Sequence, residues 1–123
     1  MDTFDYLVIG AGSGGLASAR RAARYGAKVG IVDPGPLGGT CVNTGCVPKK
    51  IMWNAAECAE WLADAAEYGF GAGSAGFDWL KLKRARDAYV QRLNAMYDRN
   101  LELDGVTLFT GRARFAEPAV LEV

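Results

Sequence analysis

The sequence predicts an α/β fold in which a parallel sheet carries a crossover helix and further long helices. Two short apolar runs rich in strand formers, residues 4–9 and 28–33, enclose a segment, 16–25, in which small apolar residues recur at helical spacing. A strand, a helix and a strand in this order form the β-α-β unit of a parallel sheet. Half of the 123 residues are hydrophobic, which is enough to bury a core, so we expect one domain or part of one.

Each element of this unit has a recognisable end. The first run stops at the glycine-rich segment 10–15, and Gly26 closes the predicted helix. The second run ends at Pro34-Gly35-Pro36, where proline and glycine favour a turn. The stripe of small residues on the helix lets its axis lie close to a sheet, as a crossover helix requires.

Two longer helices and further strands are predicted after this unit. One helix should begin near Cys46, because Gly45 relaxes the backbone before it and Pro48 suits a first helical turn, and should run toward Gly69. An amphipathic helix is predicted from about residue 78 to residue 103. The sequence then favours strands at 106–110 and 113–115, so that the chain stops at Val123 in a later strand of a sheet.

The glycines between the first strand and helix have the spacing of a dinucleotide-binding loop. Gly10, Gly12 and Gly15 lie between the two elements, and Asp33 ends the next strand about 20 residues further on. Glycines let the backbone approach a pyrophosphate, a helix N-terminus offers free N–H groups, and a carboxylate accepts from ribose hydroxyls. The pattern predicts a Rossmann-type domain that binds FAD or NAD, and an acid without a neighbouring arginine argues against NADP here. A tight turn with Asp33 at a solvated strand end is the alternative.

Charge and the N-terminal segment exclude other classes of partner. Basic and acidic residues balance at 14 each with no long run of either sign, which argues against a nucleic-acid partner. The first ten residues have no basic start and no cleavage site, and their apolar run is far too short to cross a membrane. We expect a cytoplasmic protein without membrane association, or its counterpart in an organelle.

Two of the three cysteines, Cys41 and Cys46, lie close together between a glycine pair and a Pro-Lys-Lys segment. In a reducing compartment such a pair indicates a metal site or a redox pair. Structural zinc takes four ligands, and the sequence holds only Cys58 besides and no histidine, so a closed metal site within the chain is excluded. A redox pair and two unrelated buried thiols remain as interpretations.

The helix predicted near Cys46 decides whether the two sulfurs can meet. Residues five apart in a regular helix have Cα atoms about 8.7 Å apart, beyond the roughly 7 Å that a disulfide allows. The break at Gly45 removes this obstacle. We expect Cys46 at the positive helix end, where a thiolate is stabilised, and Cys41 in the preceding turn and more exposed. Cys58 lies among alanines in a helical core pattern and is expected to be a buried thiol.

Two segments carry a resemblance to a known family. GAGSGGLASARRAARYGAKVGIVD and LGGTCVNTGCVPKK resemble the N-terminal FAD-binding part of the flavin disulfide oxidoreductases, and the resemblance runs from Tyr6 to about Phe115. Within that family, Lys49-Lys50 after Pro48, Trp53 and the segment RDAYVQRLNAMYDRNL are similar to the glutathione reductases. The resemblance implies a flavoprotein homodimer that uses NADPH and FAD to reduce glutathione disulfide in cell redox homeostasis.

The resemblance also implies roles for individual residues. Cys41 and Cys46 would form the redox-active disulfide, Cys46 nearer the flavin and Cys41 attacking glutathione disulfide, while Lys49 would lie at the flavin edge. The implied cofactor-binding residues are Gly10, Gly12, Ser13, Gly14, Gly15, Asp33, Gly39, Thr40, Cys41 and Lys49.

Ser13, Arg20 and Tyr97 are the implied substrate-binding residues. Trypanothione reductases have an acid and a tryptophan where Ala17 and Arg20 stand, whereas a guanidinium complements the carboxylates of glutathione disulfide. Without the resemblance, Arg20 would be read as a solvated helix arginine, and the spacing of Tyr97 alone indicates a core residue.

The chain departs from the family pattern in several places. Asp33 stands where glutamate is usual, Thr44 replaces a valine and Met96 an isoleucine. The family's proteins are several times longer, so we expect an N-terminal fragment, residues 1–123, without the NADPH-binding and dimerisation domains and without turnover of its own. The alternatives are a thioredoxin, trypanothione or dihydrolipoamide type of reductase, or a truncated FAD-binding module that is not catalytic.

Overall fold

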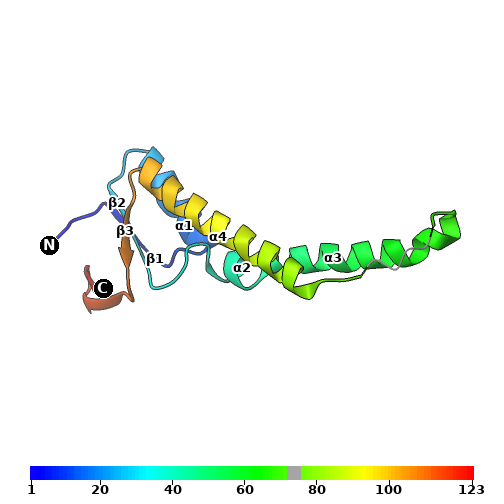
Figure 1. Ribbon diagram of the computed structural model, residues 1–123. Coiled ribbons are helices and arrows are strands. Elements are labelled where there is room, and N and C mark those ends of the chain that lie inside the picture. The colour runs from blue at the N-terminus through cyan, green and yellow to red at the C-terminus, as the bar shows by residue number, and fades with distance from the viewer. Residues whose placement is uncertain (72–75) are drawn as a thin grey trace.

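Three parallel strands in the order β1-β2-β3 form the sheet of the computed structural model, which describes residues 1–71 and 76–123 (Figure 1). The strands are β1 (Tyr6–Ile9), β2 (Val29–Asp33) and β3 (Thr107–Thr110). Val8 pairs with Ile31, which in turn pairs with Leu108. The central strand is almost wholly buried, which explains why its sequence is a continuous apolar run. The parallel α/β prediction is confirmed.

Helix α1 (Ser13–Arg24) makes the crossover between β1 and β2. It buries Leu16 and Ala19 against the strand residues Val8 and Ile31, and Gly26 reverses the chain with a φ of 93°. The helix begins three residues before the predicted start. The first turn was not predicted because it contains Gly14 and Gly15, and glycine has a low helix propensity.

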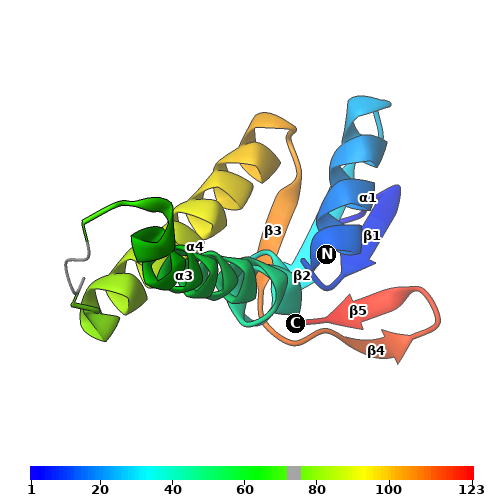
Figure 2. The same ribbon diagram turned by 90° about the vertical axis from the view of Figure 1, so that its right-hand side faces the viewer.

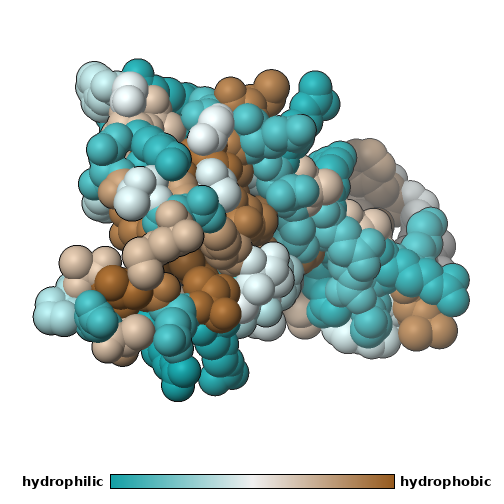
Figure 3. All heavy atoms as spheres, turned by 90° about the vertical axis from the view of Figure 1, so that its left-hand side faces the viewer, coloured by the Kyte–Doolittle hydropathy of each residue, from teal (hydrophilic) through white to brown (hydrophobic). Residues whose placement is uncertain are grey.

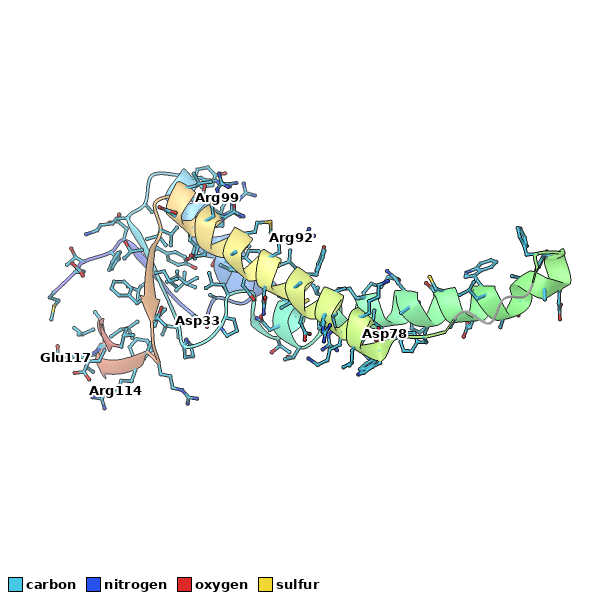
Figure 4. The ribbon with its side chains drawn as sticks, in the orientation of Figure 1. Asp33, Asp78, Arg92, Arg99, Arg114 and Glu117 are labelled. Carbon is cyan, nitrogen blue, oxygen red and sulfur yellow. The ribbon has the colours of Figure 1, made fainter. Side chains whose placement is uncertain are left out.

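Three helical elements follow β2. They are α2 (Gly39–Asn43), α3 (Cys46–Asp64) and α4 (Trp79–Leu103), and a 3₁₀ turn (Ala65–Tyr68) continues α3 up to Gly69. The predicted helix start at Cys46 is confirmed, as is the second long helix. Asp78 caps α4, accepting a hydrogen bond from the backbone N–H of Lys81 at 3.0 Å (Figure 4).

Helices α3 and α4 differ in what they bury. Helix α3 has no buried residue and extends away from the sheet, whereas the C-terminal end of α4 returns to it and buries Leu101 (Figure 1). There α4 packs against α1, and Figure 2 shows both helices with the sheet. None of the helices described is long and apolar enough to cross a membrane.

A second, antiparallel pair of strands, β4 (Arg114–Glu117) and β5 (Val120–Glu122), follows β3. Side chains alternate along a strand, so Ile9, Val32 and Phe109 point to the face opposite the helices. With the hairpin and the N-terminal residues they line a cleft of about 580 Å³. Hydrophobic residues run across this side of the molecule (Figure 3).

Candidate functional site at the glycine loops

Two glycine-lined loops meet at the carboxyl ends of β1 and β2. Gly12 and Gly38 form an isolated parallel bridge, and the backbone N–H of Gly38 donates to the carbonyl oxygen of Ala11 at 2.8 Å. A Cβ at Gly39 would come within 2.8 Å of the Gly12 Cα, so only glycine permits this approach. The N-terminal ends of α1 and α2 are thereby brought together.

The glycines of the first loop have different surroundings. A Cβ at Gly15 would collide with the carbonyl oxygen of Gly10 and lie 3.2 Å from Val8 Cγ1, so Gly15 allows α1 to pack closely on β1. At Gly10, Gly12 and Gly14 a Cβ would meet no atom within 4 Å. These three positions open to space through which a group could reach the backbone.

The first turn of α1 leaves backbone donors at this opening. Gly12 is the N-cap residue and supplies no side-chain hydrogen bond, and the first helical N–H bond is the one from Leu16 to the Gly12 carbonyl. A helix N-terminus of this kind favours an anion. Open glycines and free donors fit the pyrophosphate of a dinucleotide.

Asp33 at the end of β2 is bound within the chain (Figure 4). Its Oδ2 accepts from the backbone N–H of Ala11 at 2.7 Å, and its Oδ1 accepts from that of Gly35 at 2.8 Å. The carboxylate therefore ties the glycine loop to the turn after β2. Each oxygen has a further lone pair with which it could accept from a ribose hydroxyl.

Cys41 and Cys46 lie on either side of the break between α2 and α3. The break is the one expected, since α2 ends at Asn43 with Thr44 as its C-cap residue, and Gly45 has φ −121° and ψ −116°. Both cysteines are free thiols. The pKa of the Cys41 thiol is raised, first by its hydrogen bond with the Cys46 side chain and then by burial. The disulfide stays a prediction.

The expected exposures of the cysteines are wrong. Cys41 is half-buried and Cys46 is exposed, the reverse of the prediction, because Cys41 belongs to α2, which packs on both α3 and α4, while Cys46 begins α3. Cys58 is exposed rather than buried, because α3 projects from the sheet and nothing in the described residues covers it. An alanine-rich helical pattern indicates a core only where a partner element lies over it.

The residues expected to bind substrate line a single groove beside α1. It has a volume of about 670 Å³. Its lining consists of Ser13, Leu16, Ala17, Arg20, Arg21, Arg24, Tyr25 and Tyr97. Tyr97 also packs against the core, as its spacing indicated, and its role in substrate binding stays a prediction. Neither cysteine is among the described residues of this groove.

The remaining expected site residues lie near the loops. Thr40 is exposed on α2, and Lys49 is exposed in the first turn of α3 with its backbone N–H bonded to the Gly45 carbonyl at 3.0 Å. No group of three metal-ligating side chains occurs in the described part of the chain.

Sequence reasoning missed Asp104, the C-cap residue of α4. Its carboxylate bonds the Nε atoms of Arg20 and Arg24 at 2.5 and 3.1 Å. The only signal in the sequence is an acid before Gly105 at a helix end. That signal does not indicate a partner 84 positions away.

Comparison with known proteins gives a consistent result. The sequence profile of the family described as pyridine nucleotide-disulphide oxidoreductase matches residues 4–122. The chain is 57% identical over 122 residues to a glutathione reductase of Schizosaccharomyces pombe, covering 98% of the chain and 26% of that protein. For glutathione reductases of Yarrowia lipolytica and Debaryomyces hansenii the identities are 56% and 52%, over 89% and 92% of the chain and 24% of each relative. The chain spans about a quarter of the length of these curated relatives.

Proposed function

Because the chain belongs to the pyridine nucleotide-disulphide oxidoreductase family, we propose that it forms the N-terminal, FAD-binding part of a glutathione reductase. Its similarity to three glutathione reductases over most of its length supports this substrate class above the other reductases of the family. The homodimer and the cytoplasmic setting belong to the same proposal.

The observation that carries the proposal is the placement of Cys41 in α2 and Cys46 at the start of α3, on either side of the break at Gly45 and next to two glycine loops. The loops offer what a dinucleotide needs, namely open backbone at Gly10 and Gly12 and free N–H donors at the start of α1. FAD bound there would pass two electrons from NADPH to the disulfide form of the pair. Lys49 would place its positive charge at the flavin edge.

The chemistry of the reduced pair follows from thiol–disulfide exchange. The Cys41 thiolate attacks one sulfur of glutathione disulfide; a Cys41–glutathione disulfide forms, and the other glutathione leaves as a thiolate that takes up a proton. Cys46 then attacks the Cys41 sulfur, which closes the intramolecular disulfide and releases the second glutathione.

A hybrid enzyme tests the proposal. The chain replaces the matching segment of the S. pombe glutathione reductase, and turnover is followed by the consumption of NADPH with glutathione disulfide. We expect turnover from the hybrid and none from the 123-residue chain alone.

Two variants identify the reacting sulfurs in the hybrid. Cys41→Ser and Cys46→Ser should each retain flavin and lose turnover, whereas Cys58→Ser, the matched control on α3, should keep it. A folded, flavin-loaded hybrid without turnover, or a Cys41→Ser hybrid that still reduces glutathione disulfide, would contradict the proposal.

A further inference from the structure

The groove beside α1 carries an excess of positive charge. Arg20, Arg21 and Arg24 line it along one helix, and no acidic side chain is among its described lining residues. Arg21 lies over the ring of Tyr25, with 5.9 Å between its guanidinium carbon and the ring centroid. Such a surface complements an anionic ligand.

Asp104 supports this groove from behind. It lies outside the lining, its side chain is only 13% exposed, and it accepts from Arg20 Nε at 2.5 Å and from Arg24 Nε at 3.1 Å. The residue lies in the turn between α4 and β3, where the Val106 N–H donates to the Leu101 carbonyl at 2.9 Å and Gly105 has a φ of 71°.

Arg20 and Arg24 both donate to Asp104 through Nε, which leaves their terminal nitrogens unused by this interaction. A bond at Nε leaves both terminal Nη groups of each arginine available for a planar interaction with a carboxylate. Arg20 is the more buried of the two, with 25% of its side chain exposed against 59% for Arg24. One acid thus orients two arginines without neutralising the groove.

We propose that Asp104 is a positioning residue for the substrate: it holds Arg20 and Arg24 so that their terminal amino groups bind the carboxylates of glutathione disulfide, with Arg24 a specificity-determining residue beside Arg20. This inference rests on the proposed function. The pKa of Asp104 is lowered, first by the bond from Arg24 and then by that from Arg20, so the carboxylate is charged at neutral pH.

Removing Asp104 has two opposing effects. Freed arginines must be ordered when substrate binds, and the cost of ordering one or two such side chains corresponds to a rise in KM of about 2- to 10-fold. Loss of the negative charge favours an anion, but salt screens that effect. Near 1 M ionic strength, where the Debye length is about 3 Å, the ordering effect should dominate.

The test measures the hybrid enzyme and its Asp104→Ala, Asp104→Glu and Arg24→Gln variants near 1 M ionic strength. We expect Asp104→Ala and Arg24→Gln to raise KM for glutathione disulfide about 2- to 10-fold, with kcat, flavin content and KM for NADPH unchanged. Asp104→Glu keeps a carboxylate and should recover part of the loss. Asp87→Asn is the matched control, because Asp87 pairs with Lys83 on α4 outside the groove and should leave KM unchanged.

The outcomes separate the two proposals. A wild-type hybrid that is folded and holds flavin but does not reduce glutathione disulfide overturns the proposed function. If that hybrid is active and Asp104→Ala leaves the KM for glutathione disulfide unchanged, the positioning role is wrong while the function stands. The same conclusion follows if Asp104→Ala also changes kcat and the KM for NADPH. If Asp104→Ala loses flavin, the comparison of Arg24→Gln with Asp87→Asn decides, and equal KM values refute the role of Arg24.

Discussion

Removing the Asp33 carboxylate should destabilise the chain by about 1–3.5 kcal/mol, and this range follows from the two hydrogen bonds that the carboxylate accepts. The Ala11 residue whose N–H it binds at 2.7 Å is fully buried, so Asp33→Ala leaves that donor without a partner, at a cost of about 1–3 kcal/mol. The second bond, to the exposed Gly35 N–H, is replaced by water and contributes about 0.5 kcal/mol or less.

Asp33→Asn should give an intermediate result. The amide oxygen keeps one acceptor, but the amide nitrogen would face a backbone N–H, donor against donor. Asp5→Ala is the matched control: Asp5 is also an aspartate that accepts a backbone N–H, that of Lys28 at 2.8 Å, but its bond is exposed, so the loss should stay at or below about 1 kcal/mol.

The assay is urea unfolding of the full 123-residue chain, followed by far-ultraviolet circular dichroism. The free energies of unfolding of the variants are compared with one common slope for their dependence on urea concentration. The expected order of destabilisation is Asp33→Ala, then Asp33→Asn, then Asp5→Ala. If Asp33→Ala costs no more than Asp5→Ala, the bond to the buried N–H contributes nothing beyond a surface hydrogen bond, and the reasoning fails.

Two further predictions concern the packing and charge at the end of α4. Leu101 is 1% exposed and Leu103 is 72% exposed, so Leu101→Ala should cost about 2–5 kcal/mol and Leu103→Ala, its matched control, within about 0.5 kcal/mol in the same urea assay; equal costs would contradict the core assignment. The pKa of Asp104 in the folded chain lies below its usual 3.8, because Arg24 and then Arg20 donate hydrogen bonds to its carboxylate. The contribution of Asp104 to the free energy of unfolding is therefore complete above the pKa of the unfolded chain, and it is lost as the pH falls through the lower pKa of the folded chain. The urea midpoint of the unaltered chain should fall in that acid window more steeply than that of Asp104→Asn, and parallel curves would exclude this linkage.

Features set by neighbouring residues were predictable. The spacing of Gly10, Gly12 and Gly15 placed a turn between a strand and a helix, and Gly45 with Pro48 placed the start of α3 at Cys46. Helix ends and turns depend on dihedral preferences and hydrogen bonds among residues that are close in the sequence, so a short stretch of sequence is enough to predict them. The apolar run of β2 indicated a buried strand for the same reason.

Exposure was not predictable in this way. Cys41 was expected to be more exposed than Cys46, and Cys58 was expected to be buried. Both expectations were wrong, because burial depends on which element lies opposite, and α3 points away from the sheet instead of covering it. Asp33 likewise bonds Ala11 across 22 positions, a contact that exists only once β1 and β2 are paired in register.

The sequence by itself determined that a glycine turn joins a strand to a helix, that a cysteine pair follows this unit, and that α3 begins at Cys46. Only the tertiary structure decided that the carboxylate of Asp104 meets Arg20, 84 positions earlier in the chain, behind the groove. The physical reason is that β2 and β3 pair side by side, which places the end of α4 on α1, and such pairing depends on contacts between segments far apart in the sequence.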